Sequence, residues 1–201
     1  MSTVTKDPTA QQAAGNAQGL TPQQKIEGLQ EIVKQVGNAM LTSRSPDGKL
    51  ASRAMHPATT EGLVFSFYQN SDSGKTDDIE SDPNVNVSFI DPKTGDWVSV
   101  SGKAVINKDQ SKIKRHWSQT LQAWFDDKKD GVHTGKEDDP RVCLLDVHPE
   151  EIRYFATSGR LAFLKDVAKA TFSGGVASPG QLVIVTNDEI QLASKVHKQQ
   201  T

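Results

Sequence analysis

The amino-acid sequence predicts a mainly β protein of the α+β class, an antiparallel β-barrel with flanking helices. Two observations support this prediction. Short segments with apolar residues at every second position recur through the middle of the chain, which is typical of strands with one buried face. Turns that contain Pro, Asp and Gly separate these segments. We interpret the series as an antiparallel meander, which a barrel closes so that its edges are protected.

The first 20 residues differ in composition from the rest of the chain. They are rich in Gln, Ala, Thr and Gly and contain few large apolar side chains, so we expect 1–20 to be a disordered lead. We expect 21–201 to form a single domain with a C-terminal extension, because no internal repeat or boundary for a second domain is evident.

A helix is expected to begin the folded part. Thr21 is a suitable N-cap, Pro22 fits the first helical position, and Gln24 is placed to complete a capping box. Gly37 is typical of a helix end. The apolar residues between these signals recur at helical spacing and predict a packing helix: Ile26, Leu29, Ile32, Val33 and Val36.

The strands of the meander follow this helix. The turn Ser45–Gly48 joins the first two, because Pro46 presets φ and Gly48 supplies a positive φ. Alternation of apolar and polar residues is clearest at 85–89 and 97–106. The expected strands span residues 39–43, 49–55, 63–69, 85–89, 97–106, 142–147 and 151–155.

Two further helices are expected, at about 73–81 and 109–125. Asp82-Pro83 stops the first of them. Trp117 and Trp124 are seven residues apart in the second, so they would share one helical face.

The remaining segments are expected to be connections. The charged segment 126–139 reads as a loop without core residues, and His148–Glu151 as a turn between the last two barrel strands. Beyond Leu161 we expect a weak helix and then a short apolar run at 182–185.

Composition and charge exclude some classes of partner. A formal net charge of −2 and a pI near 6.2, with the basic residues dispersed, argue against a nucleic-acid-binding protein. No apolar run approaches the roughly 18 residues of a membrane span, and no secretory signal is evident. Cys143 is the single cysteine, which suits a reducing compartment, so we expect a cytoplasmic protein. No Cys/His cluster has the spacing of metal ligands.

The segment Phe65–Lys75 is the most specific local signal for a binding site. It is a strand followed by a small polar loop that opens a helix, whose N-terminus offers unpaired N–H groups and a partial positive charge. Ser73 adds a hydroxyl and Lys75 a cation, and Arg53 on a neighbouring strand would reach the same anion with a bidentate fork. The pattern indicates a phosphate site, with a plain turn as the alternative.

The order of several short motifs resembles a known family. The motifs are Ser52–Met55, Phe65–Lys75, Asp82-Pro83-Asn84, Val98–Ala104, and Trp117 with Trp124-Phe125. Together they resemble the pyridoxamine 5'-phosphate oxidase-like, FMN-binding split-barrel superfamily, and within it the general stress protein branch that includes blue-light-inducible proteins of filamentous fungi. The resemblance implies an antiparallel six-stranded split β-barrel that binds FMN at the interface of a homodimer.

The resemblance also implies roles for individual residues. Arg53, Ser73 and Lys75 would hold the FMN phosphate. Trp97 falls where the oxidase pattern places a glutamine near the flavin, and filling the barrel mouth is its alternative role. The residues that would line the ribityl chain and one side of the isoalloxazine are Ala54, Met55, Phe67, Tyr68 and Gln69.

Two tryptophans complete the implied site. Trp117 and Trp124 would cover the flavin ring, either of the same subunit or of the partner subunit. The alternative is that they pack in the core or at the dimer interface. No residue is assigned a catalytic role, because His56 and His116 are lone histidines without a carboxylate or serine at catalytic spacing.

Two departures from the family pattern bear on function. Gly74 stands where the oxidase pattern has an arginine, and Ala58 falls near the place of an oxidase lysine. The C-terminus also lacks the segment with which true oxidases hold the vitamin phosphate, so we do not expect a true pyridoxamine phosphate oxidase. Two functions stay open: an FMN-dependent oxidoreductase of unknown substrate, or a non-catalytic flavin-binding, storage or sensing protein in a stress or light response.

Overall fold

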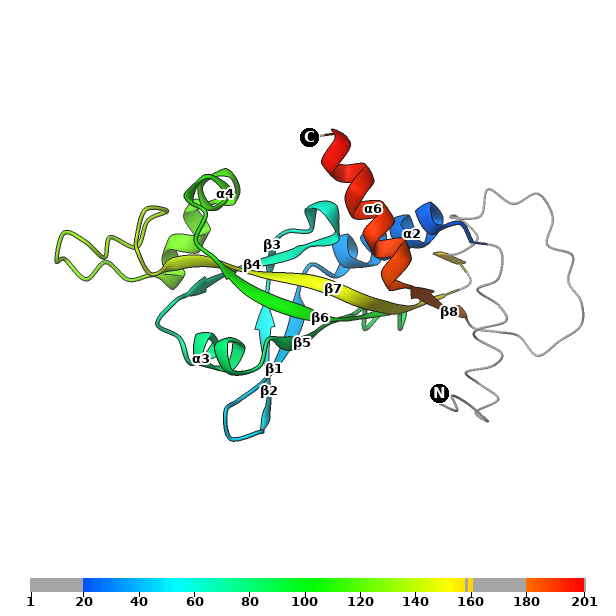
Figure 1. Cartoon of the computed structure of the whole chain (residues 1–201), viewed down its shortest axis with the longest axis horizontal. Coiled ribbons are helices and arrows are strands. Elements are labelled where there is room, and N and C mark those ends of the chain that lie inside the picture. The colour runs from blue at the N-terminus through cyan, green and yellow to red at the C-terminus, as the bar shows by residue number, and fades with distance from the viewer. Residues whose placement is uncertain (1–19, 158, 161–179, 201) are drawn as a thin grey trace, which may run out of the picture.

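The computed structural model describes residues 20–157, 159–160 and 180–200. Within this part of the chain the protein is one curled antiparallel sheet with helices packed around it (Figure 1). The predicted N-terminal lead and the weak helix expected after Leu161 fall largely on 1–19 and 161–179, outside the described residues.

The sheet has eight strands in the order β2-β1-β5-β6-β7-β4-β3, with β8 paired to β7. β2 and β3 lie at opposite ends of this order, yet only His56 separates them in sequence. The sheet must therefore curl until its two ends approach each other without pairing, which makes a split barrel. The predicted split-barrel fold is confirmed, although the strand count is eight and not six. The strands are β1 (Ala39–Arg44), β2 (Leu50–Met55), β3 (Pro57–Thr59), β4 (Phe65–Asn70), β5 (Asn84–Ile90), β6 (Trp97–Asn107), β7 (Val142–Thr157) and β8 (Gly180–Val185).

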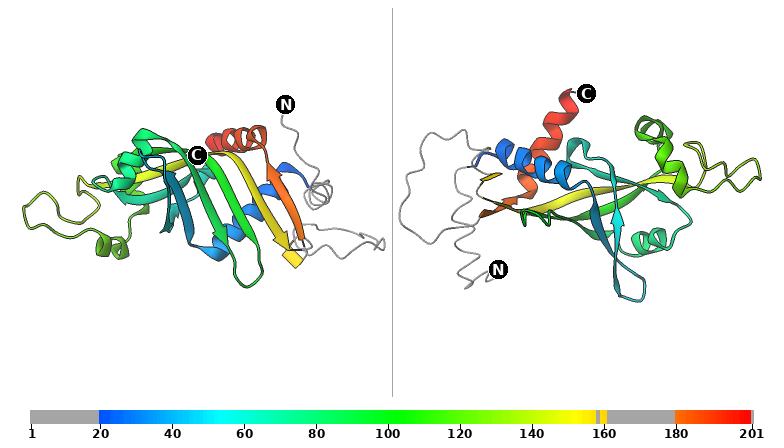
Figure 2. Two further views of the ribbon diagram at one scale, coloured as in Figure 1. Left: turned by 90° about the horizontal axis from the view of Figure 1, so that it is seen from below. Right: turned by 180° about the vertical axis from the view of Figure 1, so that it is seen from behind.

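Helices flank both ends of the sheet. The two longest, α2 (Pro22–Val36) and α6 (Asn187–Gln200), lie at the end near β8, and α4 (Gln110–His116) lies at the opposite end (Figures 1 and 2). α3 (Gly74–Ser81) packs against β1 and β6. Two short 3-10 helices, Glu61–Leu63 and Gln119–Trp124, complete the elements of the described residues. No helix among the described residues is both long and apolar enough to cross a bilayer.

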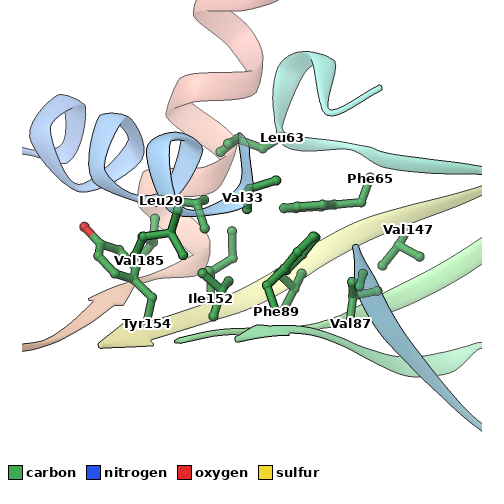
Figure 3. Close-up of a cluster of buried hydrophobic side chains, with 14 of the residues drawn as sticks. Leu29, Val33, Leu63, Phe65, Val87, Phe89, Val147, Ile152, Tyr154 and Val185 are labelled. Atoms are coloured by element: carbon green, nitrogen blue, oxygen red, sulfur yellow. The ribbon is translucent and has the colours of Figure 1, made fainter. Parts of the chain in front are cut away.

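The first helix forms as its sequence predicts. Thr21 caps α2, with its hydroxyl accepting from the Gln24 N–H at 3.2 Å and the Gln24 side chain accepting from the Thr21 N–H at 2.9 Å. Gly37 ends the helix with φ of 73°, a value that favours glycine. The apolar stripe of α2 then faces the core (Figure 3).

One continuous apolar core lies between the helices and the inner face of the sheet. Figure 3 shows Leu29 and Val33 of α2 facing the sheet residues Phe89, Ile152 and Tyr154. The Phe65 and Phe89 rings pack at a centroid distance of 6.0 Å. Burial of these side chains keeps the sheet curled, because a flat sheet would expose them to water.

The predicted helix over 109–125 is wrong, because the chain breaks after His116. α4 ends there, Trp117 is extended (φ −65°, ψ 139°), and a separate 3-10 helix runs over Gln119–Trp124. The Tyr68 hydroxyl donates to the Ile113 carbonyl at 2.6 Å. That carbonyl is the one to which the Trp117 N–H would bond if the helix continued. Trp117 and Trp124 therefore do not share a helical face.

The predicted turn at His148–Glu151 is also wrong. These residues lie inside β7, which runs unbroken along β6. The register shifts between Ser101 and Gly102, so that one extra residue of β7 forms a bulge. Pro149 is tolerated there because a bulge leaves one N–H unpaired. Gly102 is required opposite it, since a Cβ at this position would lie 2.2 Å from the His148 carbonyl oxygen.

Both tyrosines are expected to resist ionisation. Burial raises the pKa of Tyr68 to about 12, and burial followed by the Glu189 charge raises the pKa of Tyr154 above its usual value. A raised folded-state pKa stabilises the fold below about pH 10, and that contribution is lost as the pH rises toward 12. We expect the phenolate absorbance near 295 nm to stay flat through about pH 10.5, and then to rise together with alkaline unfolding followed by circular dichroism. A half-titration of the tyrosines near pH 10 in folded protein would contradict this burial.

Candidate functional site

The start of α3 forms the centre of the candidate site. Ser73 is the N-cap, with an extended backbone (φ −86°, ψ 146°), but its side chain makes no capping hydrogen bond. Its Oγ is buried and has no hydrogen-bond partner among the described residues. A buried hydroxyl without a partner is costly in a folded protein, so this atom is suited to a ligand. In the first turn of α3 the Thr76 N–H donates to the Ser73 carbonyl at 2.8 Å, whereas the N–H groups of Gly74 and Lys75 come before the first bond of the helix.

Gln69 supplies a second polar atom without a partner. Its side chain lies on the inner face of β4 and is 3% exposed. The amide nitrogen lies 3.5 Å from the Thr76 hydroxyl in the first turn of α3, while Oε1 has no partner in the described part of the chain. Gln69 therefore places an open hydrogen-bond acceptor beside the N-terminus of α3.

Lys75 is the cation of this site that has no carboxylate partner. Its Nζ lies 3.6 Å from the Met55 sulfur, a weak acceptor, and it forms no salt bridge with any described residue. Burial, followed by repulsion from Arg53, lowers the pKa of Lys75. A partly desolvated ammonium beside a second cation is an environment that an anion would stabilise.

Arg53 is held by the protein itself. Its Nη1 donates to Ser43 Oγ at 2.7 Å and its Nη2 to Asp78 Oδ2 at 3.1 Å. The terminal nitrogens of the predicted bidentate fork are thus directed toward β1 and α3. Arg53 and Met55 both lie on the inner face of the sheet, because they pair with the buried residues Leu41 and Ala39.

The structure gathers some of the predicted residues and separates others. Arg53, Met55, Gln69, Ser73 and Lys75 meet between β2, β4 and α3, and we call these five residues the phosphate cluster. Phe67 is fully buried in the main core, so its side chain faces only protein atoms.

Tyr68 points to the other face of β4, away from Gln69. There its ring meets Trp117 edge-on at 5.5 Å, and Trp117 packs against Phe125 at 6.1 Å. Trp124 stands apart from this group and is 82% exposed. Of the predicted aromatic residues, only Tyr68 and Trp117 therefore form a separate patch, together with Phe125, on the face of β4 opposite to Gln69.

Trp97 and Ala54 line a third region. An open groove of about 700 Å³ runs over the outer face of β2, β1, β5 and β6, with Ala54 on β2 and Trp97 on β6. The exposed side chains of Met40 and Ile90 border it, so its surface is largely apolar. Ala54 pairs with Met40 and so faces this groove, whereas its neighbour Met55 faces the phosphate cluster.

Two residues of the site were not predicted from the sequence. Ser43 is 1% exposed and Asp78 is 7% exposed, and their side chains join at 2.7 Å. The alternation of β1 places Ser43 on the inner face next to Arg53, which is a signal that could have identified it. Asp78 had no comparable signal. No group of three or more His, Cys, Asp or Glu residues in the described ranges could hold a metal ion.

Comparisons with known proteins identify relatives of this chain. The chain is similar to Protein bli-3 of Neurospora crassa, with 39% identity over 172 residues that cover 84% of this chain and 82% of that protein. It is 33% identical to General stress protein 26 of Bacillus subtilis over 96 residues, which cover 46% of this chain and 62% of that protein.

A solved structure and a family model extend the comparison. The structure of a pyridoxamine 5'-phosphate oxidase-related, FMN binding protein of Nostoc punctiforme matches with a TM-score of 0.52 and 14% identity, covering 68% of this chain and 86% of that one, which shows a shared fold. The model of the family described as "Pyridoxamine 5'-phosphate oxidase like" matches residues 24–177. Because this match spans most of the sequence, the chain belongs to the pyridoxamine 5'-phosphate oxidase-like family.

Proposed function

We propose that this protein binds FMN, with the flavin phosphate at the phosphate cluster, and that it is a flavin-dependent oxidoreductase. One observation carries the proposal: the buried, unpartnered Ser73 hydroxyl lies at the N-terminus of α3, next to the unpaired Lys75 ammonium. A helix N-terminus with a hydroxyl and a cation is suited to a phosphate. The FMN binding protein of Nostoc punctiforme, which shares the fold, adds support.

The polar atoms of the cluster match different parts of FMN. A phosphate needs donors, which the α3 N–H groups, Ser73 and Lys75 supply. A ribityl chain carries hydroxyl donors, and the unpartnered Gln69 Oε1 is a buried acceptor for one of them. The bound cofactor would supply the ability to accept and release electrons, and the protein's residues would orient it.

We propose a second copy of the chain as the cover of the apolar groove. Met40 is 42% and Ile90 is 63% exposed beside Trp97, and exposed apolar residues that gather at a groove are typical of interfaces. β2 is the end strand of the sheet and, among the described strands, pairs only with β1, so a flavin whose phosphate lies at the inner face would pass the free edge of β2 to reach the groove. A homodimer would enclose the flavin ring there over Ala54 and Trp97, and the exposed Trp124 would be free to contact the partner subunit. The buried free thiol of Cys143 suits a reducing compartment, so we place the protein in the cytoplasm.

Replacement of Lys75 tests the proposed phosphate contact. Lys75→Met removes the charge and keeps the aliphatic stem, so we expect FMN affinity to fall about ten- to hundredfold, the loss of one charged hydrogen bond. Riboflavin, which lacks the phosphate, should bind the variant and the parent protein equally. Lys34→Met, on an exposed position of α2, is the matched control. Fluorescence quenching of each flavin would measure the affinities, and an equal loss for both flavins would place the phosphate elsewhere.

Addition of a cation at Gly74 provides the opposite test. Nothing lies within 4 Å of a Cβ at Gly74, so a side chain can be added there without a clash. Gly74→Arg would bring an arginine to the first turn of α3, and we expect it to raise FMN affinity about three- to tenfold. Gly74→Gln adds a neutral side chain of comparable length and should leave the affinity near that of the parent. Equal effects of the two variants would argue against an electrostatic contact.

A non-catalytic flavin-binding protein is the second candidate function. This function is favoured because Lys75 is the one cation of the phosphate cluster without a carboxylate partner, which implies weak binding of the phosphate. Anaerobic mixing of the flavin-loaded protein with NADH or NADPH separates the two functions. An oxidoreductase fed by these donors should lose its visible flavin absorbance and regain it with air. Flavin that both donors leave oxidised would favour storage or sensing.

A further inference from the structure

Asp78 closes a buried triangle of polar groups around Arg53. Its Oδ2 accepts from Ser43 Oγ at 2.7 Å and from Arg53 Nη2 at 3.1 Å, while Arg53 Nη1 donates to Ser43 Oγ at 2.7 Å. The three residues come from α3, β2 and β1, and the Asp78 side chain is 10% exposed. The carboxylate is therefore a fixed feature of the site and not a mobile surface charge.

This triangle changes the charge that a phosphate meets. The cluster contains two cations, but Asp78 neutralises Arg53, so only Lys75 contributes an uncompensated positive charge. A phosphate monoester carries between one and two negative charges near neutral pH. Asp78 would repel this group and would also occupy one of the guanidinium nitrogens that the phosphate needs.

We propose that Asp78 is a built-in counter-anion that weakens the phosphate cluster and makes the bound flavin exchangeable. The inference rests on the proposed function and deepens it, since it concerns how firmly the same site holds FMN. It assigns Asp78 the role of a regulator of affinity, which acts mainly by the repulsion between its charge and the phosphate and secondarily by occupying Arg53. In this form the protein takes up and releases FMN, in contrast to a flavoprotein that keeps its cofactor permanently.

Two effects of Asp78 compete, and the geometry indicates which is larger. The carboxylate orients Arg53, which would favour phosphate binding, and it repels the phosphate, which would oppose it. Ser43 already fixes Arg53 through Nη1, so part of the orientation does not depend on the carboxylate. The negative charge of Asp78 has no such substitute, and we expect the repulsion to dominate.

Asp78→Asn tests this inference. The amide oxygen can still accept from Ser43 and Arg53, so the contacts are kept while the negative charge is lost. We expect FMN affinity to rise about tenfold, the order expected for removing a like charge beside a bound dianion, with riboflavin affinity unchanged. The variant should also retain FMN through gel filtration under conditions in which the parent protein loses it. Asp77→Asn is the matched control, because Asp77 is the exposed neighbour on α3 and the change in net charge is the same.

Each outcome supports or overturns the inference. Tighter FMN binding by Asp78→Asn alone supports it. Unchanged or weaker binding by Asp78→Asn, with normal binding by the parent and by Asp77→Asn, overturns it and leaves the proposed function intact. No FMN binding by any of the three proteins overturns both. If thermal melting shows that Asp78→Asn is unfolded, the single variant Arg53→Gln is compared with the double variant Arg53→Gln/Asp78→Asn. Tighter FMN binding by the double variant supports the inference. Equal or weaker FMN binding by the double variant overturns it.

Discussion

Burial of the inner face of the sheet in one apolar core is the constraint on which the candidate site depends. Arg53 belongs to β2, at one end of the strand order, and Lys75 follows β4, near the other end. In a flat sheet, the four strands between β2 and β4 would separate them by roughly 24 Å, at about 4.8 Å a strand. The curl that buries residues such as Phe65 and Phe89 also brings Lys75 and Arg53 together, so that burial and then repulsion from Arg53 lower the pKa of Lys75. The packing of the core thus creates the electrostatics of the site.

Local signals in the sequence were sufficient for much of the fold. The capping box at Thr21 and the alternation along β5 and β6 depend on neighbours a few residues apart, and the structure confirms them. The failures come from contacts between distant segments. The Tyr68 hydroxyl, 45 residues earlier in the sequence, donates a hydrogen bond to the Ile113 carbonyl, and α4 ends there. His148 and Pro149, predicted to lie in a turn, continue β7 because they pair with Lys103 and Gly102 of β6, more than 40 residues earlier in the chain.

In the site, too, the residues with a local sequence signal were predicted, whereas contacts between distant segments were not. Ser73 and Lys75 belong to a strand-loop-helix segment whose local pattern predicts an anion site, and the structure leaves both without a protein partner that satisfies them. The partners of Arg53 were not predictable in this way, because Ser43 and Asp78 are 35 residues apart and meet only when α3 packs on β1. The sequence alone therefore overstated the positive charge of the cluster by one unit.

Because the phosphate cluster has only one uncompensated positive charge, most of the binding free energy of FMN would come from contacts with the rest of the ligand. The apolar groove around Trp97 offers a surface for a ring, but it is open to solvent in a single chain. Under the proposed arrangement, a second copy of the chain would close that groove and remove ring and protein surface from water together. Flavin binding and dimer formation would then stabilise each other by equal free energies, since such linkage is reciprocal. Weak binding of the phosphate would therefore make the fraction of protein with bound FMN depend on dimer formation.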